Sequence, residues 1–447
     1  TEQRVALEKL GIGLNAILMN GHTGLRRQVM PADGDVNRAA NVEEIRRMQD
    51  ILRTDLAAGR SFGMSLGLEY HGALNTSLDE QLALGKVLAE YNGVFIPHVR
   101  SSGISAMGYQ PSAAKGVKPA TLEDSIQETL QVAEQTGATV VFTHMKALGT
   151  GYRGQAKRFI QTLQAARDRG ARVYMDVYPY DSSSSDGSFV AMPPWIFKGT
   201  YRTNNGEWDY RADFDAAWQQ ADAATKDSFA ADVRHQIALK GGAENIRILE
   251  FPRADYVGQS YAELMKLRRV DAVQLAILLQ REGNPQLAGG ARMRSFSMDE
   301  NDVIAFFKLD WCAVSTDGWM VLPEEAVGDK KYDDTHGRVF GSYPRRLAYF
   351  SRDLGIDTLE HAVRAASGLP AEILNIHDRG RIAPGMKADV VVLDLLKLKD
   401  NTTYLEPSVY PSGIEHVLIN GGFAVDGGER TLALRGKVLS PSSVPSP

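Results

Sequence analysis

The chain has 447 residues, a formal net charge of -5 at pH 7 and a sequence pI near 6.0. Lysine and arginine are scattered rather than clustered, which argues against a nucleic-acid partner and favours a small-molecule substrate. No apolar run approaches the roughly 20 residues that cross a bilayer, so no membrane association is expected. Cys312 is the single cysteine, so this chain alone can form neither a disulfide nor a cysteine cluster for zinc. The cellular compartment is left open by these totals.

Short apolar segments alternate with segments of helical periodicity, a pattern typical of parallel βα units. The predicted strands are residues 14–20, 62–70, 94–98, 139–144, 172–178, 246–251 and 311–315. The predicted helices are residues 2–10, 42–57, 78–90, 122–136, 156–169, 260–281, 299–307 and 359–369. Thr121 and Asp124 have the spacing of a capping box at the start of one of these helices. About seven strands fall one short of the eight that close a (β/α)8 barrel.

Two regions depart from the strand and helix alternation. Residues 182–234 contain four consecutive serines and the pair Pro193-Pro194, which indicate a long loop with a helical excursion, and we predict an inserted lid here. After residue 385, three short apolar runs are separated by glycine-rich turns and predict antiparallel strands. The predicted domains are therefore a barrel at residues 1–384 with a lid at 182–234, and part of a small β-sandwich at residues 385–447. A few strands are hardly stable alone, so the second domain is expected to draw partner strands from elsewhere.

Polar residues follow two of the predicted strands. His144 ends the run at 139–144, and Asp317 with Gly318 follows the run at 311–315. The carboxyl ends of barrel strands form the mouth at which barrel enzymes keep their chemistry. Imidazole and carboxylate both bind zinc, so this pair suggests a metal-assisted hydrolase. Each residue also has a structural interpretation, as a buried hydrogen-bonded histidine and as an ordinary Asp-Gly turn.

Six segments carry a further signal: residues 21–26 (GHTGLR), 97–100 (PHVR), 143–146 (THMK), 176–180 (DVYPY), 315–318 (STDG) and 336–338 (HGR). In order and rough spacing they resemble the N-acyl-D-amino-acid deacylases, or D-aminoacylases, of the amidohydrolase superfamily. Residues 369–389 resemble that family's return from the barrel into its small β-domain. The resemblance covers most of the chain and implies an α/β fold, a (β/α)8 TIM-like barrel that lacks its first strand or strands here, followed by a small C-terminal β-domain.

The resemblance also implies a metal centre with one or two divalent ions, expected to be Zn²⁺. His144, Asp317 and His98 are the implied metal ligands, although His98 also fits a residue that supports a ligand or contacts the substrate. Asp317 is expected to act as general base towards the metal-activated water and then as general acid towards the departing amine. Tyr178 occupies a position where some members place a metal-binding histidine, which favours one tightly bound metal.

Four residues are expected to bind the substrate. Arg338 is implied as a bidentate partner of the substrate α-carboxylate. Lys146 lies two residues after His144 and shares its side of a strand. Tyr178 is a candidate hydrogen-bond donor to the developing oxyanion, and Arg100 is the fourth expected contact.

One departure from the family concerns the N-terminus. Family members carry a His-x-His pair on the first barrel strand and usually a metal-binding cysteine soon after, and neither occurs at that place in this chain. The resemblance therefore implies that an N-terminal segment is absent, because a precursor is cut into two associated chains or because the chain is a fragment. An N-terminal chain with the His-x-His ligands is the implied partner.

The predicted function is metal-dependent hydrolysis of the amide bond in an N-acyl amino acid, with the D configuration favoured, or in a related small peptide. One alternative is a cyclic-amide hydrolase of the dihydroorotase or hydantoinase kind. The other is a non-catalytic barrel subunit of a two-chain complex.

Overall fold

The structure is a computed structural model that describes residues 2–30, 38–114, 116–186, 190–198, 208–320 and 336–441. Its largest sheet has six parallel strands in the order β1-β2-β3-β4-β5-β9. Two antiparallel sheets accompany it, β6-β8-β7 and β10-β11-β12-β13. Within the described ranges, no helix combines the length and the apolar character that a membrane crossing requires.

Strand and helix alternate along the parallel sheet as predicted. The strands are β1 (Asn20–Gly21), β2 (Gly63–Gly67), β3 (Val94–His98), β4 (Thr139–Phe142), β5 (Val173–Val177) and β9 (Cys312–Val314). The helices α2 (His22–Val29) and α3 (Val42–Ala57) both follow β1, and α4 (Leu78–Glu90), α5 (Leu122–Thr136) and α6 (Ala156–Asp168) follow β2, β3 and β4 in turn. The predicted capping box is confirmed, because the Thr121 side chain accepts from the Asp124 backbone and the Asp124 side chain accepts in return.

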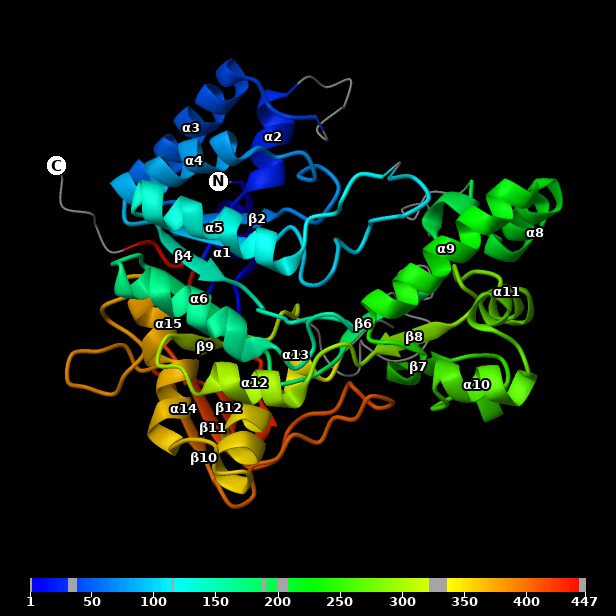
Figure 1. The fold of residues 1–447 in the computed structure, drawn as a ribbon. Helices are drawn as coiled ribbons and strands as arrows, with labels where there is room; N and C mark the ends of the chain where they lie inside the picture. The colour runs from blue at the N-terminus through cyan, green and yellow to red at the C-terminus, as the bar shows by residue number, and fades with distance from the viewer. Residues whose placement is uncertain are drawn as a thin grey trace.

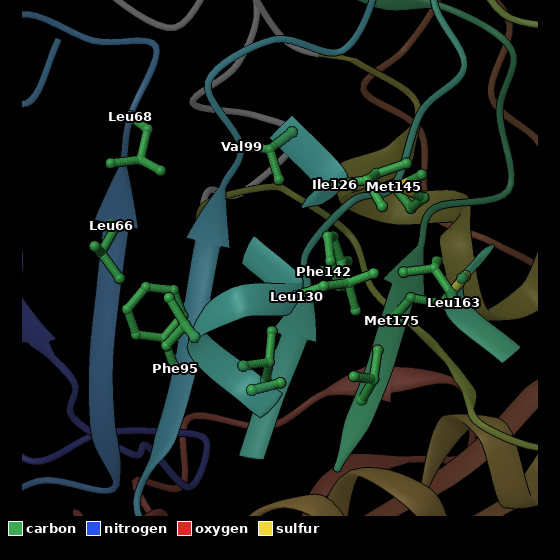
Figure 2. Packing of buried hydrophobic residues seen from close by; sticks show 14 of the residues in the cluster. Leu66, Leu68, Phe95, Val99, Ile126, Leu130, Phe142, Met145, Leu163 and Met175 are labelled. Carbon is green, nitrogen blue, oxygen red and sulfur yellow. The ribbon is translucent and has the colours of Figure 1, made fainter. Parts of the chain in front are cut away.

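The core of this unit lies between the sheet and its covering helices. Phe95, Phe142 and Met175 project from the strands, and Leu130 and Leu163 from α5 and α6 pack against them, as Figure 2 shows. All five side chains are at most 3% exposed. Burying one such side chain contributes about 1.5–3 kcal/mol, so this layer holds the strand ends in place.

A separate unit is inserted between β5 and β9. It consists of β6 (Ser183–Asp186), η1 (Pro194–Ile196), α8 (Tyr210–Gln220), α9 (Ala223–Leu239), η2 (Ala243–Asn245), β7 (Ile246–Glu250), η3 (Ala254–Tyr256), α10 (Tyr261–Arg268), α11 (Ala272–Glu282) and β8 (Arg292–Ser295). It has its own hydrophobic core, with Phe214, Phe229 and Met293 among its buried residues. In Figure 1 it lies to one side of the parallel sheet, drawn in green.

Two sequence predictions are corrected in the insertion. Residues 246–251 form a strand, but its assignment to the barrel is wrong: β7 pairs antiparallel with β8, because Ile246 and Ile248 pack into the core of the insertion. The single helix predicted at 260–281 is two helices, since Arg269 adopts a left-handed conformation that ends α10 and Asp271 caps α11. The predicted lid at 182–234 covers part of this unit, and its residues 187–189 and 199–207 lie outside the described residues. Its role as a lid stays a prediction.

The C-terminal region forms the predicted antiparallel strands. They are β10 (Val390–Leu393), β11 (Ile414–Ile419), β12 (Gly422–Asp426) and β13 (Glu429–Arg430). The remaining helices, α12 (Glu300–Phe307), α13 (Arg338–Arg345), η5 (Arg346–Asp353), α14 (Leu359–Ala366) and α15 (Gly368–Ile373), lie between the insertion and this sheet in the sequence.

The N-terminal region begins with the predicted helix α1 (Glu2–Leu10). The strand predicted at residues 14–20 is wrong in extent, since only β1 at its end joins the parallel sheet. The preceding residues instead form isolated bridges with the C-terminal segment, Ile12 with Gly436 and Ala16 with Val438. This segment therefore runs beside the far end of the chain because its backbone groups find partners there.

Candidate functional site

The candidate site lies at the carboxyl ends of the parallel strands. Because these strands share one direction, the residues that follow them meet at one edge of the sheet. The side chains that concern the site are Glu69 and Tyr70 after β2, His98 at the end of β3, His144 and Lys146 after β4, Asp176 and Tyr178 at the end of β5, and Asp317 after β9. Arg338 joins them from the start of α13.

A chain of hydrogen bonds links four of these side chains. Lys146 Nζ lies 2.7 Å from His144 Nδ1, and His144 Nε2 lies 2.9 Å from His98 Nδ1. His98 Nε2 lies 2.7 Å from Glu69 Oε2, and the other Glu69 oxygen accepts from the Met107 backbone at 2.5 Å. Lys146 donates to His144 Nδ1, so the neutral His144 ring carries its proton on Nε2. His144 Nε2 then donates to His98 Nδ1, and His98 Nε2 donates to Glu69. All four side chains are buried, so this chain fixes the orientation of both imidazoles.

The backbone is strained at two site residues. His144 has φ 37° and Asp317 has φ 46°, in the left-handed region that residues other than glycine adopt uncommonly. At His144 the strain is supported by Asp176, whose Oδ1 accepts from the His144 backbone at 2.8 Å. Burial raises the pKa of Asp176 above its ordinary value. Strained backbone of this kind concentrates at functional sites and indicates one here.

Burial also lowers the pKa values of the two basic residues that follow β4, His144 and Lys146. It lowers the pKa of His144 well below its ordinary value, and the charges of Lys146 and His98 lower it further. The imidazole is therefore neutral at pH 7, which is the form that binds metals. Burial lowers the pKa of Lys146 to about 8, while the Asp317 carboxylate opposes that change.

Asp317 and Arg338 form an ion pair beside the imidazoles, with Nη1 and Oδ2 2.9 Å apart. The Arg338 guanidinium lies 4.9 Å from the centre of the Tyr178 ring, and Lys146 Nζ lies 5.5 Å from it. Tyr178 donates its hydroxyl to the Met298 sulfur at 3.9 Å, a weak acceptor. Arg338 Nε is buried and has no hydrogen-bond partner among the residues that the structure describes. The site thus holds a donor that remains available to an anionic ligand.

The structure does not bring Arg100 into this cluster, so the geometry does not support the substrate-binding role predicted for it. β3 ends at His98 and the chain then turns towards α5, where Arg100 donates to Glu128 at 2.7 and 3.0 Å. It also donates to the backbone carbonyls of Leu74 and Thr76. Tyr180 is similarly engaged, because its hydroxyl donates to Asp400 at 2.7 Å.

Sequence reasoning missed Glu69 and assigned no role to Asp176. Glu69 follows an apolar strand directly, as Asp317 does, and that position is a usable signal. Asp176 lies inside the strand-like run at 172–178, where an acidic residue among apolar neighbours marks a buried carboxylate that needs a partner.

The imidazoles of His98 and His144 are suitable metal ligands, but two ligands are too few to hold a metal ion. His98 and His144 direct ring nitrogens at each other across 2.9 Å, and a metal ion held by both would replace the proton that they share. Among the residues that the structure describes, no group of three or more His, Cys, Asp and Glu side chains is arranged to hold a metal ion. The described residues therefore supply two ligands of an incomplete set.

Comparison with known protein families and curated proteins agrees with this geometry. Residues 212–425 match the model of the amidohydrolase family. The chain is 29% identical over 417 residues to the N-acyl-D-glutamate deacylase of Alcaligenes xylosoxydans xylosoxydans, covering 93% of this chain and 68% of that protein. It is 26% identical to the N-acyl-D-aspartate deacylase of the same organism, covering 98% of this chain and 70% of that protein.

Solved structures extend the similarity to the fold. A structure of D-aminoacylase that concerns the role of its binuclear metal center is 25% identical, with a TM-score of 0.68 over 98% of this chain and 74% of that chain. The N-acyl-D-glutamate deacylase from Bordetella bronchiseptica, complexed with zinc and a phosphonate that mimics the tetrahedral intermediate, is 26% identical, with a TM-score of 0.66 and the same coverage. The chain therefore matches the amidohydrolase family model over residues 212–425 and shares the fold of the D-aminoacylases over nearly all of its length.

Proposed function

We propose that the chain is a metal-dependent hydrolase of the amide bond in N-acyl amino acids of D configuration. The observation that carries the proposal is the contact between His98 and His144 at adjacent strand ends, with the Asp317 and Arg338 pair beside it. The relatives that are similar over more than nine tenths of this chain are named as deacylases of N-acyl-D-glutamate and N-acyl-D-aspartate, which supports the reaction class.

In this proposal His98 and His144 hold a divalent metal, and Zn²⁺ suits their nitrogen ligands. A bound divalent metal supplies an acidified water and polarises the amide carbonyl. Glu69 orients His98 through the hydrogen bond to Nε2, as carboxylates commonly do for ligating histidines. We infer that further ligands come from polypeptide outside the described residues, for which an N-terminal chain with a His-x-His pair is the candidate.

The proton transfers are assigned to Asp317. Its side chain is 32% exposed, so water and substrate can reach it. The carboxylate removes a proton from the attacking water and delivers it to the nitrogen of the departing amine. The products are a carboxylate and a free amino acid.

Three side chains around Asp317 are assigned to substrate binding: Arg338, Tyr178 and Lys146. Arg338 retains a buried donor at Nε, which is suited to the α-carboxylate of an amino acid. Burial raises the pKa of Tyr178, so its hydroxyl stays protonated and donates to the oxyanion that develops on the carbonyl. Lys146 contributes a second positive charge near Tyr178.

The test is hydrolysis by the purified protein, with any chain that co-purifies, after addition of Zn²⁺. Release of amino acid is measured from N-acetyl-D-glutamate, N-acetyl-D-leucine and their L enantiomers, and ring opening is measured for hydantoin. We expect hydrolysis of D substrates at rates well above those of the L series. Hydantoin opening without hydrolysis of any linear substrate, or no turnover at all, contradicts the proposal. Intact mass spectrometry of the same sample tests for the second chain.

A further inference from the structure

The loop between β3 and α5 connects the site to the insertion. Residues 101–114 form neither helix nor strand, so contacts with other parts of the chain hold them in position. In Figure 1 this loop, drawn in cyan, extends towards α9 of the insertion, drawn in green. Within the loop, the Met107 amide donates to Glu69 Oε1 at 2.5 Å, while Glu69 Oε2 accepts from His98 Nε2 at 2.7 Å. The position of the loop therefore decides whether Glu69 keeps one of its two partners.

Gln236 of α9 binds this loop through its side-chain amide. Its Nε2 donates to the carbonyl oxygen of Met107 at 3.1 Å and to that of Tyr109 at 3.2 Å. A primary amide nitrogen carries two hydrogens, so both are used on the loop. The side chain is buried, and its Oε1 makes no hydrogen bond with the residues that the structure describes. Within that part of the chain, the hydrogen bonding of Gln236 is devoted to the loop.

Two neighbours of Gln236 hold the same loop. Asp232 accepts from the Ser112 backbone at 3.0 Å and from the Ser112 hydroxyl at 2.5 Å. His235 Nε2 lies 2.8 Å from the Ser105 hydroxyl. Residues three and four apart lie on one face of a helix, so these side chains form a single surface directed at the loop. α9 therefore fixes the loop at several places along its length.

We propose that Gln236 is a positioning residue of the metal site. It holds Met107 where the Met107 amide occupies one oxygen of Glu69, and Glu69 orients the His98 ring with the other. A hydrogen bond to the second nitrogen of a ligating imidazole fixes the ring, and its loss weakens metal binding. The insertion thus supports the site without contacting metal or substrate. This inference rests on the proposed function, in which His98 binds the metal, and deepens it.

A pair of buried glutamines in the insertion provides the test variant and its control. Gln236→Met keeps the length of the side chain and removes both donors to the loop. Gln280→Met is the matched control, because Gln280 is fully buried and its Oε1 accepts from the Gly289 backbone at 2.5 Å. That bond holds a loop of the insertion itself and not the loop that contacts Glu69.

The first measurement is made on the protein without metal. Nitrogen-15 NMR of the histidine side chains follows the Nε2 proton of His98, whose signal is assigned by its loss in His98→Asn. In the wild type and in Gln280→Met we expect slow exchange with solvent, because Glu69 accepts this proton. In Gln236→Met we expect exchange to be faster by roughly tenfold, the factor that corresponds to about one lost hydrogen bond.

The second measurement is the affinity for Zn²⁺, determined by competition with a chelator in the protein with any co-purifying chain. Gln236→Met is expected to weaken zinc binding by roughly 3- to 10-fold, less than the roughly 10- to 100-fold expected for Glu69→Gln, which acts on His98 directly. Activity that is lost at limiting zinc is expected to return in excess zinc. A variant with a merely damaged fold would not recover in this way.

An Nε2 proton of His98 that exchanges as slowly in Gln236→Met as in Gln280→Met overturns the inference. A zinc affinity equal in these two variants also overturns it. Should the wild type neither bind zinc nor hydrolyse a substrate, the proposed function fails, and the exchange measured without metal still decides whether Gln236 orients His98. If Gln236→Met does not fold, Asp232→Asn weakens the hold on Ser112 and is expected to accelerate the same exchange to a smaller extent. Unchanged exchange in Asp232→Asn would then contradict the inference.

Discussion

The parallel-sheet unit and the insertion differ in where their polar residues lie. Both have buried cores rich in aromatic and aliphatic side chains. In the parallel sheet, however, every strand delivers its following residue to the same edge, which is how His98, His144 and Asp317 meet. The antiparallel sheet of the insertion sends successive strand ends in opposite directions and gathers no such cluster among the described residues. Strand direction therefore decides which unit carries the chemistry.

The largest expected effect concerns the acid at the end of β9. Asp317→Asn is expected to lower kcat by roughly 10²- to 10⁴-fold, because an amide cannot accept and return the proton. The melting temperature is expected to stay unchanged, since asparagine tolerates the left-handed backbone. Steady-state kinetics and a thermal melt measure the two quantities.

A matched carboxylate in the insertion provides the control. Asp215 pairs with Arg281 on the surface of the inserted unit, so Asp215→Asn is expected to leave kcat within about twofold of wild type. If Asp317→Asn behaves like this control, the assignment of proton transfer to Asp317 is wrong.

The next prediction tests whether the parallel-sheet unit and the insertion unfold independently. Phe142→Ala in the parallel sheet and Phe229→Ala in the insertion each remove a fully buried ring, and each is expected to destabilise its own unit by about 3–5 kcal/mol. Hydrogen exchange followed by mass spectrometry is expected to show faster exchange in β3 to β5 for the first variant and in α8 to β8 for the second. Acceleration across both units in either variant would mean that they unfold as one, against the separation described above.

Arg338→Lys is expected to have a smaller effect, confined to binding. Lysine keeps the charge but loses the planar pair of donors, so KM is expected to rise roughly tenfold for substrates with a free α-carboxylate. Matched substrates with an amidated α-carboxyl group are expected to change little. An equal rise in KM for both series would show that Arg338 does not bind the α-carboxylate.

The smallest effect concerns a helix cap that supports the sheet unit. Glu44 accepts from Arg38 at 2.8 Å and from the Asn41 backbone at 2.9 Å, and the Arg38 hydrogen bond above all lowers its pKa from 4.5 to about 2. A carboxyl group with a lowered folded-state pKa stabilises the fold above pH 4.5 and loses that contribution as the pH falls towards 2. Glu44→Gln is therefore expected to lower the free energy of unfolding by about 1 kcal/mol at pH 7 and by nothing near pH 2.

The corresponding cap in the insertion is Glu263 at the start of α10, whose carboxylate is more exposed. Glu263→Gln is expected to change stability less than Glu44→Gln at pH 7. Urea unfolding of both variants between pH 2 and 7 measures the difference. A Glu44→Gln effect that does not depend on pH would contradict the role of the ion pair.

Local sequence signals were sufficient to predict most helices and strands of the parallel-sheet unit. The helices α3, α4 and α5 begin and end at the predicted residues because capping side chains such as Asn41, Ser77 and Thr121 mark their starts. His144, Asp317 and Lys146 could be singled out because a polar residue after an apolar strand is a local feature.

Features that depend on distant partners could not be predicted in this way. Residues 246–251 have the composition of a barrel strand, and only pairing with β8 assigns them to the insertion. Arg100 carries the same charge as Arg338, and only the position of Glu128 removes it from the site.

The central claim is that His98 and His144 meet at the strand ends to hold the metal of a hydrolase. Anomalous diffraction at the zinc edge from crystals of the purified protein, with any co-purifying chain, tests it most directly. We expect a zinc peak about 2.0–2.1 Å from ring nitrogens of both residues. Zinc bound elsewhere, with the contact between the two imidazoles unchanged, would contradict it.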